Sequence, residues 1–319
     1  MDSNYYLYFI CIIWWIFNKL YNIGDKVNIN KRDILKVLLS FIIFFYIGSI
    51  AVLICRGFLN IDFKNHPIYV LVLEAVVELI IGVIVFFLYK DLFKKSIKKI
   101  KESQLSLKKI GEVLLLGYVT VFGTNFLLTT CGLVIGNLFG IESLKSDNQL
   151  LIENLRNLSP FLMFISACIL APVVEETIFR GGIGKVIKNK KVFITVSGLI
   201  FGLMHVTEST TLLIEILSLG IIVSYILNNE KYSDKRKVIL SFTSIIGILL
   251  IGFIIFYLEY GNILNVIKNL DPSEIIASFS YIGMGVGLAS IYANNGDLLR
   301  NIGIHATVNA IALIILFFK

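Results

Sequence analysis

Three short motifs place polar and ionisable side chains inside long apolar stretches of this sequence. They are Glu175-Glu176-x-x-x-Arg180, Phe201-x-x-x-His205 and His305-x-x-x-Asn309. An ionisable side chain costs about 2.5–3.5 kcal/mol at the centre of a membrane-spanning helix, so membrane proteins keep such groups where they act. Two of the three histidines of the chain lie in these motifs. We therefore predict a chemical site within the membrane.

The first motif combines a paired and an unpaired carboxylate. Residues four apart lie on the same face of an α-helix, so Glu176 and Arg180 can form an ion pair, which lowers the cost of keeping both in the membrane. Glu175 lies about 100° around the helix from Glu176, without a basic residue one turn away. A free carboxylate of this kind suits a general base that removes a proton from water.

The other two motifs offer imidazole and amide groups. Phe201 shares a helix face with His205, and His305 shares one with Asn309. Small residues near the same turns would let neighbouring helices approach closely. These residues are Gly198, Gly202 and Gly303. Each motif alone is compatible with a purely structural role, but the recurrence of the pattern in three segments favours a shared site.

The composition indicates the fold class. The chain has 319 residues, of which 57% are hydrophobic and 16% charged, and its mean hydropathy is +0.84. Soluble domains average about 45–50% apolar and about 25% charged residues. The apolar residues form long runs rather than the alternating segments of about ten residues typical of a membrane barrel. We predict an all-α, polytopic transmembrane helix bundle in the cell membrane.

Apolar segments long enough to be candidate spans are centred near residues 11, 45, 78, 125, 169, 199, 219, 248, 284 and 310. The first, about residues 5–17, is shorter than the others. Most of the 29 Lys and Arg residues fall in every second loop, which predicts that these loops are cytoplasmic and that both termini are extracytoplasmic. The same distribution argues against a nucleic-acid-binding surface, although the net charge is +7.

Two further features accompany the predicted spans. The loop 90–110 repeats apolar residues at helical spacing between lysines, which favours an amphipathic helix on the anionic inner leaflet over a solvated linker. Glu74 and Glu78 lie one turn apart inside the third span. They could join helices, bind a cation or proton, or form an accessory wall of a catalytic chamber.

The predicted topology puts one motif residue at a different height from the others. Glu175 and His305 are each five residues from an arginine, or about 7.5 Å of helix rise. His205 follows Lys191 by fourteen residues, or about 21 Å. The three side chains can meet only if the helix of His205 is strongly tilted or begins earlier. We predict that residues 183–191 are helical and dip into the membrane.

In this order on successive membrane helices, the motifs resemble those of the CPBP family, the CAAX-processing and bacteriocin-processing (Abi-type) intramembrane proteases. The likeness covers about residues 158–319, and the segment GVGLASIYANNGDLLRNIGIHATVNA is similar to the last two helices of the family. Residues 1–157 form an N-terminal transmembrane region without a comparable signature. The protease-like core departs from the family by an additional apolar span near residues 238–258.

The resemblance implies a role for each motif residue. Glu175 would activate the attacking water, and His205 would assist it. His305 and Asn309 would hold a metal or stabilise the oxyanion. The supporting residues are Glu176, Arg180 and Phe201. The family has been described both as metalloproteases and as glutamate-dependent peptidases, so a zinc ion on Glu175, His205 and His305 and a metal-free site both stay open.

The leading interpretation is an intramembrane endopeptidase that cleaves hydrophobic or membrane-anchored peptides with a water activated by Glu175. The Ile-, Lys- and Asn-rich composition is similar to that of AT-rich bacteria, where prenylated substrates are not expected. Maturation of a bacteriocin or peptide pheromone, or self-immunity, is then the favoured role. The alternatives are a proton- or cation-coupled transporter that uses Glu74, Glu78, Glu175 and the two histidines, and a catalytically inactive membrane scaffold.

Overall fold

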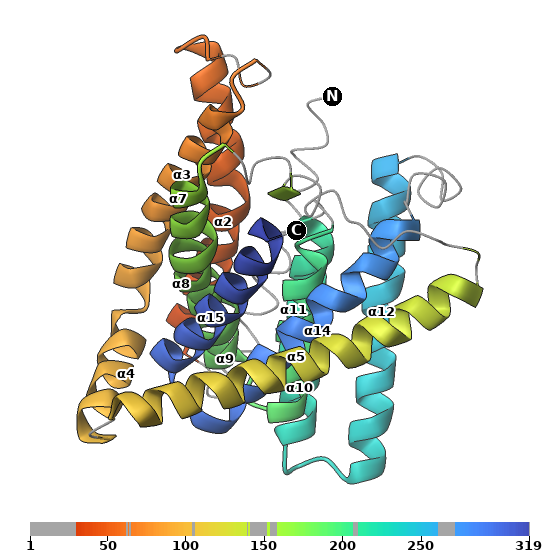
Figure 1. The fold of residues 1–319 in the computed structure, drawn as a ribbon. Helices are drawn as coiled ribbons and strands as arrows, with labels where there is room; N and C mark the ends of the chain where they lie inside the picture. The colour runs from red at the N-terminus through yellow and green to blue at the C-terminus, as the bar shows by residue number, and fades with distance from the viewer. Residues whose placement is uncertain are drawn as a thin grey trace.

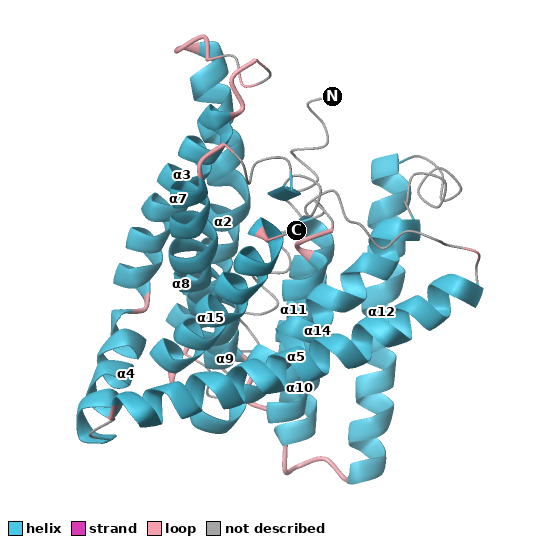
Figure 2. Ribbon diagram, in the orientation of Figure 1, coloured by secondary structure: helices cyan, strands magenta, loops and turns pink. Residues whose placement is uncertain are grey.

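A computed structural model describes residues 30–61, 63, 65–103, 106–138, 140, 152–153, 158–206, 210–260 and 272–318. Helices make up nearly all of this part, and it contains no strand (Figure 2). The prediction of an all-α helix bundle with several membrane spans is confirmed. The predicted first span, about residues 5–17, lies outside the described residues.

The N-terminal part of the described chain contributes α2 (Lys31–Gly57), α3 (Ile68–Leu88), α4 (Lys90–Ser103) and α5 (Leu107–Leu138). Asn30 starts α2 as its N-cap, because its side chain accepts a hydrogen bond from the Arg32 N–H at 3.0 Å. α2 and α3 pack together, and α5 crosses the molecule obliquely (Figure 1).

The first motif lies on an interrupted helix that runs from Pro160 to Val186. Its consecutive segments are α7 (Pro160–Ile165), the π-helical turn η1 (Ser166–Leu170), α8 (Ala171–Glu175), the π-helical turn η2 (Glu176–Gly182) and α9 (Ile183–Val186). In a π-helical turn each N–H bonds to the carbonyl five residues back, so the two interruptions change which residues face each neighbouring helix.

The remaining described helices are α10 (Lys190–Leu203), α11 (Thr210–Asn228), α12 (Asp234–Tyr260), α14 (Pro272–Asn295) and α15 (Leu298–Phe317). Every predicted span centre among the described residues therefore falls on a helix. Within the described residues, 6 helices are long and apolar enough to cross a membrane. They are Arg32–Gly57, Ile68–Leu88, Leu107–Leu138, Pro160–Val186, Ile276–Asn295 and Leu298–Phe317. α10 has only 14 residues and is shorter than a full span.

The helix that carries the second motif begins later than predicted. Residues 183–186 are helical, but they end the preceding helix, and α10 begins only at Lys190. Asn189 caps α10, since its side chain accepts hydrogen bonds from two N–H groups of the first turn, both at 3.2 Å. Ser224 of α11 holds the same turn by accepting a hydrogen bond from the Asn189 N–H at 2.9 Å. This capped turn replaces the continuous helix that we expected between 183 and 191.

α14 packs most extensively against α5 and α10. Glycines permit this approach on both sides. A Cβ atom at Gly202 of α10 would lie 2.5 Å from the Ile282 backbone nitrogen, and one at Gly283 of α14 would lie 2.6 Å from the Asn125 Cα of α5. The prediction that small residues bring helices together is therefore confirmed for α10. Gly303 differs, because the nearest atom to its Cβ would be a leucine side chain at 3.4 Å.

The additional span near residues 238–258 is α12, which lies at the edge of the bundle (Figure 1). It packs mainly against α11, and Val238, Ile239 and Phe242 are exposed. α14 still packs directly against α10 and α5. The extra span therefore does not separate the last two helices from the helices that carry the other motifs.

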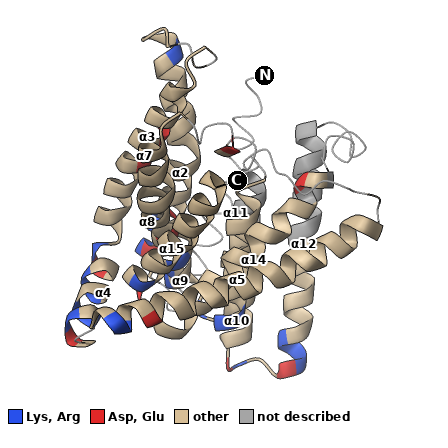
Figure 3. Cartoon of the chain, viewed as in Figure 1, with Lys and Arg blue, Asp and Glu red and all other residues tan. Residues whose placement is uncertain are grey.

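The basic segment 90–110 is helical as far as Ser103, and its last residues belong to α5. α4 is amphipathic, with Phe93 and Ser96 buried. Its Lys99 Nζ donates hydrogen bonds of 2.7 and 3.3 Å to backbone carbonyls in the turn between α14 and α15. Lys and Arg residues gather at this end of the molecule (Figure 3). α4 therefore ties the basic end of the N-terminal helices to the last two helices.

An ion pair joins α4 to α9. Lys185 Nζ lies 2.5 Å from Asp91 Oδ2. Burial alone would raise the pKa of the Asp91 carboxyl, but the hydrogen bond and the positive charge of Lys185 outweigh burial and lower this pKa. A carboxyl whose pKa is lowered on folding contributes stability above its unfolded pKa and loses it as the pH falls through the folded value. The pair therefore stabilises this contact at neutral pH.

Candidate active site

Pro172 determines how the first and third motifs are joined. In η1 the Ala171 N–H donates to the Ser166 carbonyl, five residues back. Residue 172 would continue this register by donating to the Ala167 carbonyl, but proline has no N–H. Asn309 of α15 supplies the missing donor, since its Nδ2 lies 2.7 Å from the Ala167 carbonyl oxygen. The third motif thereby fastens α15 to the helix of the first motif.

Glu176 is fully buried and is held by donors from two helices. Arg180 Nε lies 3.3 Å from its Oε2, and both side chains are 0% exposed, so the predicted ion pair is confirmed. From α15, Asn301 Nδ2 donates to Oε2 at 2.8 Å, and His305 Nδ1 lies 2.9 Å from Oε1. N–H groups therefore meet both oxygens of this carboxylate, which offsets the cost of burying it.

Arg180 lies inside the bundle, whereas the predicted topology used it to mark the cytoplasmic end of its helix. Its guanidinium Cζ lies 4.4 Å from the centroid of the Phe201 ring, a cation–π contact. Its Nη2 donates to the Gly285 carbonyl of α14 at 3.2 Å. Arg180 is thus a buried link between the first motif, the second motif and α14.

The burial of Arg180 more than halves the difference in height that the sequence suggested. The helix continues past Arg180 to Val186 before the chain turns. Glu175 is therefore about 16 Å of helix rise from the turn and not about 7.5 Å, while His205 is about 22 Å from the start of α10. The two side chains can meet without a strong tilt or an earlier helix start.

Phe201 lies close to both motif histidines. Its ring centroid is 4.8 Å from that of His205 and 5.7 Å from that of His305. Its carbonyl oxygen lies 2.7 Å from His205 Nδ1, and because a carbonyl can only accept, this nitrogen carries the proton. Tyr281 of α14 stacks on the His205 imidazole, with ring centroids 4.6 Å apart and 9° between the planes. These contacts fix the orientation of the His205 ring.

His305 connects the two glutamates of the first motif. Its Nδ1 faces Glu176, and its Nε2 lies 3.8 Å from Glu175 Oε2. This second distance is longer than a hydrogen bond, but catalytic hydrogen bonds are often long before substrate binds. The side chain of His305 is 2% exposed and that of Glu175 is 12% exposed. Glu175 is therefore the group of this pair that reaches open space.

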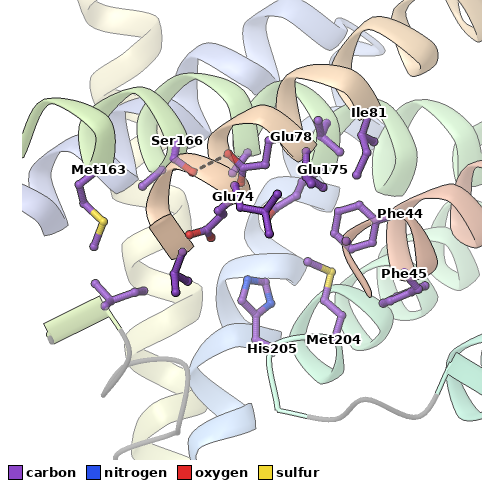
Figure 4. A pocket seen from close by; sticks show the side chains of 18 of the residues that line it. Phe44, Phe45, Glu74, Glu78, Ile81, Met163, Ser166, Glu175, Met204 and His205 are labelled. Atoms are coloured by element: carbon purple, nitrogen blue, oxygen red, sulfur yellow. Dashed lines mark hydrogen bonds between the residues drawn. The ribbon is translucent and has the colours of Figure 1, made fainter. Parts of the chain in front are cut away.

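A cavity of about 600 Å³ lies beside the motifs (Figure 4). One residue of each motif lines it, namely Glu175, His205 and Asn309. Most other lining side chains are apolar. They include Phe44, Phe45, Val77, Ile81, Met163 and Met204. The structure thus brings the three motifs to a single chamber, large enough for a short stretch of an apolar ligand.

Glu74 and Glu78 of α3 line the same cavity. Ser166 of η1 donates a hydrogen bond of 2.5 Å from its Oγ to Glu78 Oε2. Figure 4 shows both carboxylates near Glu175. This position supports the interpretation of Glu74 and Glu78 as a wall of the chamber. It also means that the N-terminal region contributes to the site.

The side chains considered as zinc ligands are not gathered into a three-ligand group. Within the part of the chain that the structure describes, no three His, Cys, Asp or Glu residues lie where they could hold one metal ion. Nδ1 of His305 is engaged by Glu176 and Nδ1 of His205 by the Phe201 carbonyl, so only Nε2 of either ring could face an ion, as is usual for ligating histidines. The described side chains of Glu175, His205 and His305 are nevertheless not gathered into a zinc site in this conformation.

Three side chains at the site were not identified from the sequence. They are Asn301, Tyr281 and Ser166. Asn301 precedes His305 by four residues, so the third motif extends to Asn301-x-x-x-His305-x-x-x-Asn309 on one face of α15, a spacing that was visible in the sequence. Tyr281 and Ser166 act from helices whose packing partners the sequence does not reveal.

Comparison with known proteins agrees with the geometry. Residues 157–311 match the family model described as type II CAAX prenyl endopeptidase Rce1-like. UPF0177 protein YajF of Lactococcus lactis subsp. lactis (strain IL1403) is 37% identical over 71 residues, or 22% of this chain and 35% of that protein. UPF0177 protein YaiH of the same strain is 36% identical over 72 residues, or 23% of this chain and 30% of that protein. The matches thus span about a third of these relatives, and no solved structure matches the chain significantly.

Proposed function

Because residues 157–311 match the Rce1-like CAAX endopeptidase family model, we propose that the chain is an intramembrane endopeptidase for hydrophobic or membrane-anchored peptides. The observation that carries this proposal is the arrangement of Glu175, His205 and Asn309 around one cavity. The long apolar helices of the bundle support a site at membrane depth.

Glu175 is the proposed general base. Its carboxylate takes a proton from water as the water oxygen bonds to the carbonyl carbon of the scissile peptide. The tetrahedral intermediate then expels the amine as the C–N bond breaks, and the proton passes to the amine nitrogen. The products are a new carboxyl terminus and a new amino terminus. Few waters enter an apolar chamber, and charge stabilisation by fixed dipoles is stronger there than in bulk water.

His205 and Asn309 have complementary proposed roles. Since His205 donates from Nδ1 to the Phe201 carbonyl, its Nε2 is an acceptor in the neutral ring and can orient the attacking water. Asn309 uses one amide N–H on the Ala167 carbonyl and keeps the second. This second N–H can donate to the oxyanion of the tetrahedral intermediate.

The walls of the chamber suggest its substrate. Aromatic, methionine and aliphatic side chains line most of it, so an apolar peptide segment can exchange water or lipid for these surfaces. Glu74 and Glu78 add a polar side next to the proposed base. The biological role that we propose is the maturation of a bacteriocin or peptide pheromone, or self-immunity. The family resemblance supports this role, and an apolar chamber suits a hydrophobic peptide substrate.

The decisive test is cleavage of a quenched fluorogenic apolar peptide by the purified chain in lipid nanodiscs. Glu175→Gln keeps the shape of the side chain but removes the base, so we expect kcat to fall on the order of 10²–10⁴-fold. Glu112→Gln is a matched control because Glu112 is exposed on α5, outside the cavity, and we expect this variant to cleave at the original rate. Unchanged cleavage by Glu175→Gln would overturn the proposal and favour the transporter or scaffold interpretation.

A further inference from the structure

A buried network surrounds Glu176, and the mechanism above does not use it. The network consists of Glu176, Arg180, Asn301 and His305, whose exposures are 0%, 0%, 0% and 1%. A simple ion pair between Glu176 and Arg180 would fasten two turns of one helix. Here the Glu176 carboxylate is also hydrogen-bonded to two side chains of α15, and one of them is the motif histidine His305.

The chemistry of the partners fixes where the protons lie. Asn301 Nδ2 contacts two oxygens, Glu176 Oε2 at 2.8 Å and the Leu288 carbonyl at 2.9 Å. A carbonyl only accepts, so the amide must point its NH2 group in this direction. The Oδ1 of Asn301 is left without a hydrogen-bond partner, which shows that the amide gives up one interaction to donate to Glu176.

Glu176 is therefore an ionised acceptor with donors on both oxygens. Asn301 donates to Oε2, His305 Nδ1 lies on Oε1, and Arg180 Nε forms an ion pair with Oε2 at 3.3 Å. A carboxylate offers no proton, so His305 Nδ1 must carry one and donate it. In the neutral imidazole the other nitrogen, Nε2, is then an acceptor, and Nε2 is the atom that faces Glu175.

We infer that Glu176, oriented by Arg180 and Asn301, is a positioning residue that makes His305 the proton partner of Glu175. This inference rests on the proposed peptidase function. It gives the second glutamate of the motif a role in proton transfer in addition to its ion pair with Arg180. It also extends the functional set to Asn301.

The proton movements balance. Glu175 removes a proton from water as the C–O bond forms, and the resulting carboxylic acid passes this proton to His305 Nε2. The imidazolium lies between the carboxylate of Glu176 on Nδ1 and that of Glu175 on Nε2, so its positive charge is stabilised on both sides. His305 returns the proton to Glu175, which delivers it to the amine nitrogen as the C–N bond breaks.

The first test measures turnover. Glu176→Gln removes the negative charge beside Nδ1, and Asn301→Ala removes one donor that orients Glu176. We expect kcat to fall at least on the order of tenfold in both, with KM nearly unchanged because neither side chain lines the cavity. Asn125→Ala is the matched control. Its Nδ2 also donates to a carbonyl of α14, that of Ser280, at 2.9 Å, and we expect its kcat to change less than twofold.

The second test does not depend on activity. With His66 and His205 replaced by Gln, His305 is the single histidine of the chain and can be labelled with ¹⁵N. We expect nitrogen NMR to show Nδ1 protonated and Nε2 unprotonated, and to show mixed tautomers after Asn301→Ala or Glu176→Gln.

Each result decides the inference. An Nε2-protonated His305 in the chain that carries only His66→Gln and His205→Gln overturns it, even if Glu176→Gln fails to fold. Retention of full kcat by Asn301→Ala also overturns it. Loss of kcat in Asn125→Ala equal to that in Asn301→Ala would reduce Asn301 to a general packing residue. Failure of the proposed peptidase mechanism is recognised separately, because Glu175→Gln would then cleave the peptide at the same rate as the unmodified chain.

Discussion

At the scale of single residues, Phe201 has the most varied contacts in the site. Its ring lies against Arg180 and near both motif histidines, and its backbone carbonyl orients His205. The family resemblance implied only a supporting role for this position. Phe201 supports the site although its side chain has no polar atom. The face of its ring contacts the Arg180 guanidinium, and its backbone carbonyl accepts the hydrogen bond from His205.

Asn309 is the residue for which the structure makes the sharpest stability prediction. Asn309→Ala leaves the Ala167 carbonyl without its donor, which we expect to cost about 1–3 kcal/mol. Adding Pro172→Ala restores a backbone N–H at residue 172, in the register that η1 already follows. We expect the double variant to recover most of the thermal stability in nanodiscs. Its cleavage rate stays low, since the proposed oxyanion donor is still missing.

If the stability losses caused by Asn309→Ala and Pro172→Ala simply added in the double variant, this account would be contradicted. The N–H of residue 172 would then not point at the Ala167 carbonyl. Pro172→Ala alone is the control, and we expect it to change stability little because Asn309 already satisfies the carbonyl.

The contacts of single residues were predicted well where both partners lie on the same helix. The pairing of Glu176 with Arg180 follows from their spacing, and it is present. The partners of Asn301 and Ser166 lie on other helices, and the sequence contains no direct signal for such contacts. Arg180 was misplaced for a related reason. A basic residue beside glycines resembles the start of a loop, and only the packed structure shows the ring of Phe201 that covers it.

At the scale of helices, the closest contact near the site is between α10 and α14. Gly202→Ala would place a methyl group 2.5 Å from the Ile282 backbone nitrogen, and backbone atoms cannot move aside cheaply. We expect a loss of about 1–3 kcal/mol in stability, measured as a lower midpoint of thermal unfolding in detergent. Cleavage should fall as well, because His205 directly follows α10.

Gly123→Ala provides the comparison for this prediction. Gly123 lies on α5 with nothing within 4 Å of the added Cβ, so alanine there should be neutral or stabilising by up to about 1 kcal/mol. Equal destabilisation of both variants would mean that the added bulk is harmful at any helical glycine and that the α10–α14 contact is not special.

The sequence predicted helices better than it predicted their ends and interruptions. Apolar length identified nearly every described helix, because burial in lipid requires it. The π-helical turn η1 was not predicted, since it involves Pro172 within the helix and a donor from α15. The turn before α10 was missed because its cap at Asn189 is completed by Ser224 of another helix.

At the scale of the whole molecule, positive charge is unevenly distributed. Lys and Arg gather at one end, at α4, at the turn before α10 and at the turn between α11 and α12 (Figure 3). Basic residues alternate between successive loops along the sequence. Because successive spans run in opposite directions, this alternation brings the basic loops to the same end of the molecule. The interior packing could not be deduced in this way, because lipid-facing and protein-facing apolar residues have similar compositions.

The charge distribution predicts how the chain is oriented in the membrane. After replacement of the 4 native cysteines, Ser233→Cys probes the turn between α11 and α12, and Leu59→Cys probes the turn after α2, where Leu59 is 63% exposed. We expect a membrane-impermeant maleimide to label Leu59→Cys in intact cells and Ser233→Cys only after permeabilisation. The opposite pattern would place the basic end outside and invert the predicted topology.

The π-helical turn η2 has a consequence for the interpretation of related sequences. A turn of this kind is one residue longer than its α-helical equivalent, so loss of a single residue downstream of Arg180 would let it relax. The loss would be absorbed within the turn, so the helix upstream would keep its orientation relative to α9, whereas Glu176 and Arg180 inside the turn would face different neighbours. Such a homologue would keep all three signatures and yet lose the contacts that hold Glu176. Alignment gaps at this point, more than substitutions in the motifs, are therefore where lost activity should be sought.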